Sequence, residues 1–307
     1  MPNQLEKRTI FLAIIGRPNV GKSSLINALL KEKIAIVSNK PQTTRTRIMG
    51  ILTKNETQMV FIDTPGLHQP KTHLGKYMVK SIHESIGGVD VCVLVVEAGK
   101  QVSKEELQLI EKLKELSLRA VLVINKIDLL SDKTILMDQI SNLSKLFVFE
   151  AIVPISAKLQ EGIETLEEEL KKLTYPSEHF FPDDTITDQP ERVLASEIIR
   201  EKLLRFLNEE VPHGIAVSIE RMKQRENQPE IMDIDAVIFC EKESHKGIII
   251  GKNGCVLKRV GRCAREDMEN FFCCKINLQL WVKVKEDWRN RDQLLRSLGY
   301  RESDFDL

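Results

Sequence analysis

The first half of the chain alternates short apolar runs with segments whose apolar residues recur at helical spacing. This alternation predicts strands and helices in turn, and so an α/β domain whose mostly parallel sheet is covered by helices on both faces. The six predicted strands are Thr9–Ile15, Arg47–Thr53, Gln58–Asp63, Val89–Val96, Ala120–Asn125 and Ala151–Ile155. The predicted helices are Lys22–Leu30, Leu74–Ile86, Ser103–Glu115, Thr134–Leu146 and Ile163–Thr174.

Two connections in this half depart from the strand–helix pattern. Residues 54–57 are too few for a crossover helix, so the two strands that they join are expected to pair antiparallel. Asn39–Gln42 lies in a long polar connection between the first helix and the second strand. Long connections in compact domains often carry function, which makes this segment a candidate site.

A different order of elements follows a stretch with three prolines and several acidic residues. It predicts an irregular linker at 175–190, with one domain at 1–174 and a second at 191–307. The second domain is predicted to be α+β, in the order α-β-β-α-α-β with a terminal helix. Its predicted elements are a helix at Val193–Glu210, strands at Ile215–Met222 and Ile231–Cys240, two helical stretches around Gly251–Gly254, a strand at Lys275–Lys285 and a helical tail at Asp287–Leu298.

Composition narrows the class of protein. The chain has 307 residues, a length typical of two domains, and its formal net charge is zero, so any binding of nucleic acid or membrane has to be local. No apolar stretch approaches the ~20 residues of a membrane span, and the first residues lack the pattern of a secretory signal. None of the six cysteines forms a C-x-x-C pair, which favours reduced thiols in a cytosolic protein.

The segment Gly16–Ser24 matches the phosphate-binding pattern G-x-x-x-x-G-K-[ST]. It follows a predicted strand and precedes a predicted helix, the context that the motif requires. Backbone N–H groups of such a loop bind phosphates, Lys22 adds a positive charge and Ser23 offers a hydroxyl to Mg²⁺. The expected phosphate contacts are Gly16, Arg17, Pro18, Asn19, Val20, Gly21, Lys22, Ser23 and Ser24.

A second motif, Asp63–Gly66, ends a buried apolar strand. A carboxylate there can hold Mg²⁺ through water, and the N–H of Gly66 can reach a γ-phosphate. The expected contacts are Asp63, Thr64, Pro65, Gly66 and Leu67.

Two further motifs favour guanine as the base. Asn125–Asp128 follows another buried strand, and the Asp128 carboxylate can accept two hydrogen bonds from the N1–H and 2-amino groups of guanine, a pair that adenine lacks. Ser156–Lys158 follows the last strand and would offer the N–H of Ala157 and the stem of Lys158 to the base. The expected base contacts are Asn125, Lys126, Asp128, Ser156, Ala157 and Lys158.

In this order the motifs resemble the five sequence motifs of translation-factor-class GTPases of the Ras-like fold. Gln42–Arg45 resembles the switch of the Era, EngA and MnmE group, which implies that Thr44 is a Mg²⁺ ligand and Thr43 a near neighbour, although the sequence alone leaves open which of the two holds the metal. The resemblance implies Ser23, Thr44 and Asp63 as metal ligands. It implies as catalytic residues Asn19, Lys22, Thr44, Asp63 and Gly66.

One residue departs from Ras-like chemistry. Leu67 stands where Ras-type proteins have the glutamine that orients water, so intrinsic hydrolysis is expected to be slow or to depend on another group. Asn19 resembles an asparagine that helps related proteins bind K⁺, and activation of hydrolysis by K⁺ is therefore a hypothesis.

The second domain carries G-x-x-G at Gly251–Gly254, after an Ile-Ile-Ile run. This is the loop with which KH domains hold the nucleic-acid backbone, and Lys246–Arg265 contains six Lys or Arg and no acid. The alternative is a helix–turn–helix with a flexible turn and a solvated basic helix, but the order of elements resembles the type II KH fold. Ile248, Ile249, Ile250, Val256 and Leu257 are groove candidates. The expected RNA contacts are Lys246, Ile248, Ile249, Ile250, Gly251, Lys252, Asn253, Gly254, Lys258, Arg259 and Arg262.

Together the two halves resemble the Era family of bacterial GTPases over nearly the whole chain. The family implies GTP, GDP and Mg²⁺ as ligands, the 3′ end of small-subunit ribosomal RNA and the 30S subunit as partners, a role in 30S assembly, and a cytoplasmic monomer. Its switch regions would be Lys33–Arg47 and Thr64–Ser85. Three alternatives are an EngA-like factor, an RNA-binding scaffold with an inert nucleotide site, and a GTPase with weak peripheral contact to the inner membrane.

Overall fold

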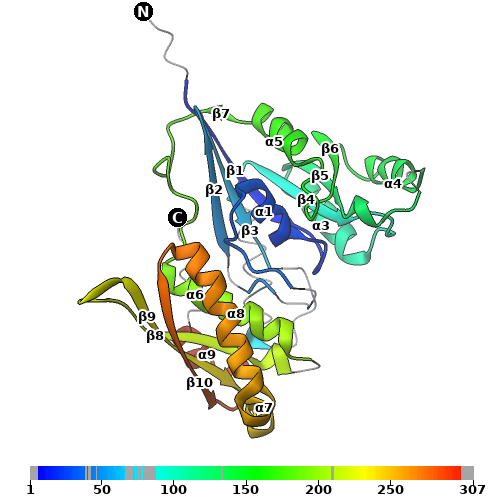
Figure 1. The fold of residues 1–307 in the computed structure, drawn as a ribbon. Coiled ribbons are helices and arrows are strands. Elements are labelled where there is room, and N and C mark those ends of the chain that lie inside the picture. The colour runs from blue at the N-terminus through cyan, green and yellow to red at the C-terminus, as the bar shows by residue number, and fades with distance from the viewer. Residues whose placement is uncertain are drawn as a thin grey trace, which may run out of the picture.

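The chain folds around two β-sheets, one in each half. The computed structural model describes residues 6–38, 40, 43–45, 47–65, 72–74, 78, 88–132, 134–208 and 211–298. Figure 1 shows the second sheet and its helices below the first domain, with α6 running close to the loops of that domain.

The first sheet has the strand order β2-β3-β1-β4-β5-β6. Its strands are β1 (Arg8–Ile15), β2 (Ile48–Lys54), β3 (Thr57–Asp63), β4 (Val91–Glu97), β5 (Arg119–Asn125) and β6 (Ala151–Ile155). Strands β2 and β3 pair antiparallel, and the pairs β3–β1, β1–β4, β4–β5 and β5–β6 are parallel, as predicted. Each strand boundary lies within two residues of its predicted position.

Helices cover both faces of this sheet, and two apolar clusters fill the space beneath them. The helices are α1 (Lys22–Leu30), α3 (Lys104–Glu115), α4 (Thr134–Ser144) and α5 (Ile163–Lys172), with a 3₁₀ turn η1 (Ile127–Leu129) after β5. The predicted helix at 74–86 lies mostly outside the described residues. Because β1, β4 and β5 are buried on both faces, their sequences are nearly continuous apolar runs.

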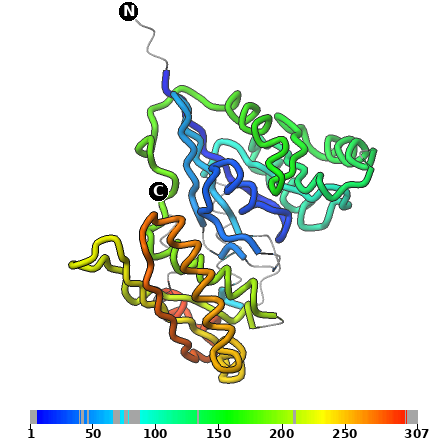
Figure 2. The backbone as a smooth tube through the Cα atoms, viewed as in Figure 1, coloured from blue at the N-terminus to red at the C-terminus, as the bar shows by residue number. Residues whose placement is uncertain are grey.

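The predicted linker lies against the first sheet. Residues of β7 (Tyr175–Pro176) pair antiparallel with β1. The sheet therefore has two antiparallel pairs, whereas the sequence predicted a single one. Beyond it, the N–H of Ile51 donates to the carbonyl of Ile186 at 2.8 Å, and the Thr187 hydroxyl donates to the carbonyl of Met49 at 2.6 Å. Figure 2 shows this green segment descending beside the blue strands. The edge strand β2 has unpaired backbone groups, and the segment satisfies some of them.

The second sheet has the order β10-β9-β8, with β9 parallel to β10 and antiparallel to β8. Its elements are α6 (Glu191–Phe206), η2 (Val211–Gly214), β8 (Ala216–Arg225), β9 (Gln228–Cys240), α7 (Glu243–Ile250), η3 (Lys252–Gly254), α8 (Cys255–Phe272), β10 (Lys275–Val284), η4 (Trp288–Asn290) and α9 (Asp292–Ser297). The order of elements is the predicted one.

The first helix and the hairpin of the second domain have other bounds than predicted. The first helix ends at Phe206 rather than Glu210, because Leu207 is extended (φ −103°, ψ 151°) and buried in the core of this domain. The hairpin is also longer than predicted, since β8 continues to Arg225 and β9 begins at Gln228. The polar residues there form exposed strand ends rather than a loop.

Candidate nucleotide site and RNA groove

The phosphate loop joins β1 to α1 through glycines that no other residue could replace without strain. Gly21 has φ +99°, and a Cβ on it would lie 2.2 Å from Nδ2 of Asn125. A Cβ on Gly16 would lie 2.4 Å from the carbonyl oxygen of Val95. No side chain of the described residues caps the start of α1, so its first N–H groups can bind an anion.

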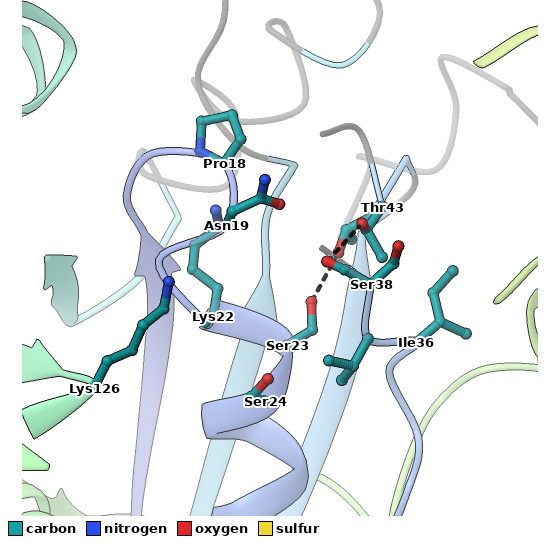
Figure 3. Close-up of a pocket in the computed structure, with 12 residues that line it drawn as sticks. Pro18, Asn19, Lys22, Ser23, Ser24, Ile36, Ser38, Thr43 and Lys126 are labelled. Carbon is teal, nitrogen blue, oxygen red and sulfur yellow. Dashed lines mark hydrogen bonds between the residues drawn. The ribbon is translucent and has the colours of Figure 1, made fainter. Parts of the chain in front are cut away.

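A cavity of about 340 Å³ opens beside this loop (Figure 3). Several predicted phosphate and metal contacts line it, together with residues of the expected switch region Lys33–Arg47 that were not predicted as contacts. The lining residues are Pro18, Asn19, Gly21, Lys22, Ser23, Ser24, Ile36, Val37, Ser38, Thr43, Thr44 and Lys126.

Three oxygen-bearing side chains meet at one side of the loop. The Ser23 hydroxyl donates to Oδ2 of Asp63 at 2.8 Å, and the Thr44 hydroxyl lies 2.9 Å from Ser23 and 3.1 Å from the same carboxylate oxygen. Oδ1 of Asp63 is buried and has no hydrogen-bond partner among the described residues. Hydroxyl and carboxylate oxygens are the ligands that Mg²⁺ prefers, so these residues fit the metal. Thr43 differs from Thr44, because its hydroxyl donates to the carbonyl of Lys40 instead.

Burial shifts the pKa values of the two charged side chains of this site, Asp63 and Lys22. It raises the pKa of Asp63, an effect that Lys22 and the hydroxyls of Ser23 and Thr44 oppose. It also lowers the pKa of Lys22 to about 8, with Asp63 opposing, so most of the ammonium stays protonated at pH 7. Nζ of Lys22 donates to the carbonyls of Gly16 and Arg17 at 3.0 Å each, which holds it against the loop.

Asn125 ties the base-recognition loops to the phosphate loop. Its amide nitrogen donates to the carbonyl of Val20 at 2.8 Å, and its amide oxygen accepts from the N–H groups of Lys126 and Ala157 at 2.8 and 3.1 Å. The side chain is almost fully buried, so this asparagine positions the pocket from beneath. The Ser156 hydroxyl donates to Oδ1 of Asp128 at 2.6 Å and orients the carboxylate. Lys158, by contrast, is exposed.

Some predicted contacts have other partners. The Arg17 guanidinium pairs with the buried Glu106 of α3 at 2.9 Å, and the Thr64 hydroxyl donates to the carbonyl of Ile14 at 2.8 Å. Val20 is buried in the core. The side chains of Thr64 and Val20 are thus directed away from a nucleotide, whereas the Arg17 side chain is held by Glu106 and remains partly exposed. Gly66 and Leu67 lie outside the described residues.

In the second domain, a groove of about 530 Å³ runs between α8 and β10. It combines apolar residues of the strand with basic residues of the helix, as a nucleic-acid groove requires. The sequence motifs missed its strand side, because β10 bears no basic cluster or glycine signal. The groove is lined by Gly254, Leu257, Lys258, Gly261, Arg262, Arg265, Ile276, Asn277, Leu278 and Leu280.

One predicted RNA contact is wrong. Ile249 is fully buried in the core of the second domain, since the face of α7 that carries it packs inward, and it cannot touch RNA. Its neighbour Ile248 is half exposed. Arg259 is exposed but stacks on the Phe206 ring of α6 at 4.4 Å, away from the groove lining.

Comparisons with known proteins match both domains. Residues 11–126 match the family described as 50S ribosome-binding GTPase, and residues 210–289 match the KH domain. The chain is 50% identical to GTPase Era of Clostridioides difficile (strain 630) over 292 residues, 95% of this chain and 98% of that protein. It is 49% identical to GTPase Era of Ruminiclostridium cellulolyticum over 291 residues, 95% and 97% of the two chains.

Two solved structures match over the same extent. One is a single-residue variant of Aquifex aeolicus Era bound to GDP.AlF4⁻, with a TM-score of 0.92, 38% identity and coverage of 95% and 99%. The other is Era in complex with MgGDPNP and nucleotides 1506–1542 of 16S ribosomal RNA, with the same TM-score and identity and coverage of 96% and 99%. The predicted fold, a Ras-like GTPase domain followed by a KH domain, is confirmed.

Proposed function

The chain belongs to the Era family of GTPases, and from this premise we propose that it is a GTP-hydrolysing switch that binds the 3′ end of 16S ribosomal RNA and acts in assembly of the 30S subunit. Use of GTP, GDP and Mg²⁺ follows from the family. The observation that carries the RNA half is the full-length relative that holds MgGDPNP and nucleotides 1506–1542 together. That complex favours the small subunit, although the name of the matching GTPase family refers to the 50S particle.

The first domain supplies the parts of a GTPase centre. The phosphate loop and Lys22 would hold the phosphates, while Ser23, Thr44 and Asp63 would hold Mg²⁺, which neutralises charge on the phosphates when bound. Asp128 would accept the hydrogen bonds of guanine. Because these residues are held by hydrogen bonds and burial, little rearrangement of them is needed for binding.

The second domain supplies the RNA site. Gly254, the last residue of the G-x-x-G loop, lines the groove, and Lys258 and Arg262 place positive charge along one wall. Few aromatic rings are present, so recognition would rest on backbone contacts and base edges.

Crosslinking of the full chain to total bacterial RNA, with GDPNP and with GDP, tests the assignment. We expect the mapped site at the 3′ end of 16S RNA, enriched with GDPNP. Enrichment of mRNA or tRNA would overturn the assembly role. A GTP turnover assay with Lys22→Ala as the inactive control tests the alternative of an RNA-binding scaffold. We expect the unmodified chain to hydrolyse GTP and the variant not to, whereas a scaffold with an inert site would show no turnover in the unmodified chain.

We also place the protein in the cytoplasm. None of the helices in the described part of the chain is long and apolar enough to cross a membrane. Fractionation of cells tests the alternative of weak peripheral contact with the inner membrane, which would place the protein in the membrane pellet at low salt and release it at high salt.

A further inference from the structure

Helix α6 is buried on two sides. One side packs apolar residues into the core of the second domain. Its other side carries three successive charged residues, Arg200, Glu201 and Lys202, which are only 2%, 7% and 4% exposed. Charged side chains are rarely this buried unless they are paired, so their partners show what the helix does there.

Arg200 and Glu201 have partners in the segment between α1 and β2 that holds the metal-site threonine, whereas Lys202 pairs with Glu201 and with Asp267 of α8. The Arg200 guanidinium donates to the backbone carbonyl of Thr43, the residue directly before Thr44. Glu197, one turn earlier on α6, accepts from Nε of Arg200 at 2.7 Å and fixes the fork of the guanidinium. The second domain therefore holds the backbone on the amino side of Thr44 through this hydrogen bond.

A second arginine, Arg45, anchors the backbone on the carboxyl side of Thr44. Arg45 is 1% exposed and enters the second domain, where it donates to the carbonyls of Ile215 and His213 at 2.6 and 3.0 Å. Its guanidinium lies 5.8 Å from the ring centre of Trp288, which is itself fully buried and donates to the carbonyl of Gly214 at 3.0 Å.

Thr44 thus lies between two arginine anchors that cross the domain interface in opposite directions. Its own hydroxyl points to Ser23 and Asp63. We propose that Arg45 and Arg200 are positioning residues for Thr44, so that the second domain sets how well the first binds Mg²⁺ with a GTP-like nucleotide. The inference rests on the proposed function, because it takes Thr44 as a metal ligand.

The mechanism is one of preorganisation. A loop threonine that must be ordered on binding costs affinity, and anchoring both of its neighbours lowers that cost. The benefit falls on nucleotides that engage Thr44, a γ-phosphate with Mg²⁺, and not on GDP. Linkage then requires that a ligand which shifts α6 also shifts GTP affinity.

Fluorescent GDPNP and GDP titrations of the full chain with Mg²⁺ provide the test. Arg200→Ala removes a charge-assisted hydrogen bond and is expected to weaken GDPNP binding at least about tenfold, with GDP binding changed less than about twofold. Arg45→Ala is expected to act in the same direction, and Arg200→Lys to recover part of the loss. The matched control is Arg192→Ala, an exposed arginine on the first turn of the same helix, which should change neither affinity.

A double-mutant cycle separates positioning from general stability. If Arg200 acts through Thr44, Arg200→Ala should cause little further loss in a Thr44→Ala background. Equal weakening of GDP and GDPNP, or a full additional loss in that background, would overturn the proposal. Failure of the unmodified chain to bind GDPNP would instead refute the proposed function.

Discussion

The carboxylate of Asp128 is the residue on which choice of base depends. It is oriented by the Ser156 hydroxyl at 2.6 Å. Asp128→Asn would present an amide to the two donors of guanine, and one donor would lose its acceptor. We expect GTP affinity to fall about a thousandfold or more, in line with the penalties for unpaired polar groups in specific sites.

Xanthine nucleotides provide the control for Asp128→Asn. Xanthine carries a carbonyl in place of the 2-amino group, so the amide can pair with it. Titration with fluorescent xanthosine diphosphate should show tighter binding to the variant than to the unmodified chain. A GTP affinity that stays within tenfold would show that Asp128 does not recognise the base.

Asn19 carries the hypothesis that hydrolysis depends on K⁺. It adopts a left-handed backbone conformation (φ 65°), and Figure 3 shows its amide beside the cavity that Lys22 and Ser23 line. A monovalent cation held there would add the positive charge that an arginine finger supplies in other GTPases. GTP turnover should be faster in K⁺ than in Na⁺, and Asn19→Ala should remove the difference while nucleotide affinity changes only a few-fold. Equal rates in the two salts for the unmodified chain would exclude K⁺ activation.

Single residues could be predicted from sequence where a spacing pattern encodes their chemistry. Ser23, Lys22 and Asp63 lie together because their motifs follow strands whose carboxyl ends share one edge of the sheet. Side-chain direction could not be predicted in the same way. Arg17 turns to Glu106 because a buried carboxylate needs a partner, and nothing in the phosphate-loop pattern indicates Glu106.

Among the elements, the loop between α7 and α8 has two glycines with different constraints. Gly251 has φ +72°, and a Cβ on it would lie 2.5 Å from Cγ2 of Val256, whereas Gly254 has φ +75° and its nearest contact would be 3.9 Å away. Gly254 is left-handed (ψ 14°), where alanine costs roughly 1–2 kcal/mol, whereas Gly251 (ψ 170°) adopts a conformation that is essentially restricted to glycine, and only Gly251→Ala adds a clash.

Gly251→Ala should therefore lower the thermal midpoint and the RNA affinity more than Gly254→Ala does. Calorimetry and RNA titration measure the two effects. GTP turnover without RNA should stay unchanged in both variants. A larger loss from Gly254→Ala would contradict the loop geometry.

The outer part of the β8–β9–β10 sheet contains a pH-sensitive pair. Hydrogen bonds from Arg225 and Asn277 lower the pKa of Asp233 to about 2. Because the folded pKa lies below the ordinary value of about 3.9, this stabilisation is present above that pH and is lost as the pH falls toward 2. Asp233→Asn should thus destabilise the chain at pH 7, and the deficit should shrink between about pH 4 and pH 2.

Denaturant unfolding across that pH range measures the deficit. Glu230→Gln, an exposed change on the same strand, serves as the control. A deficit that does not depend on pH would assign the effect to packing rather than to charge.

Elements were predictable where apolar periodicity decides them, and α6 shows the limit. Its apolar face was evident from residues such as Ile198 and Leu203, but Arg200, Glu201 and Lys202 are charged and would ordinarily face water. Arg200 and Glu201 are buried because a loop more than 150 residues away in the sequence supplies partners for them, and Lys202 pairs with Asp267 of α8. Local patterns hold no information on such a partner.

At the scale of the whole molecule, ion pairs connect the two domains in addition to the covalent linker. Lys33 pairs with Glu201 of α6 and with Asp267 of α8 at 2.6 Å each, and Lys202 pairs with the same Asp267. The segment after α1 is thereby linked to the helix that walls the RNA groove. The sequence predicts two domains from its order of elements, but not this network, since each member is an ordinary surface residue by type.

Distribution of charge predicts how RNA binding responds to salt. The net charge of the chain is zero, so attraction to RNA comes from the six basic residues of 246–265 and not from the field of the whole protein. If each of them neutralises one phosphate, log K should fall with log[salt] with a slope no steeper than about −4, because each contact with a single strand contributes about −0.7.

Lys258 and Arg262 line the groove, so Lys258→Gln and Arg262→Gln should each make this slope shallower by about 0.7. Lys223→Gln, on an exposed part of β8, should leave the slope unchanged. Filter binding of a 16S 3′-end fragment at several KCl concentrations measures the slope, and a slope much steeper than the limit would mean that RNA contacts basic residues beyond α7 and α8.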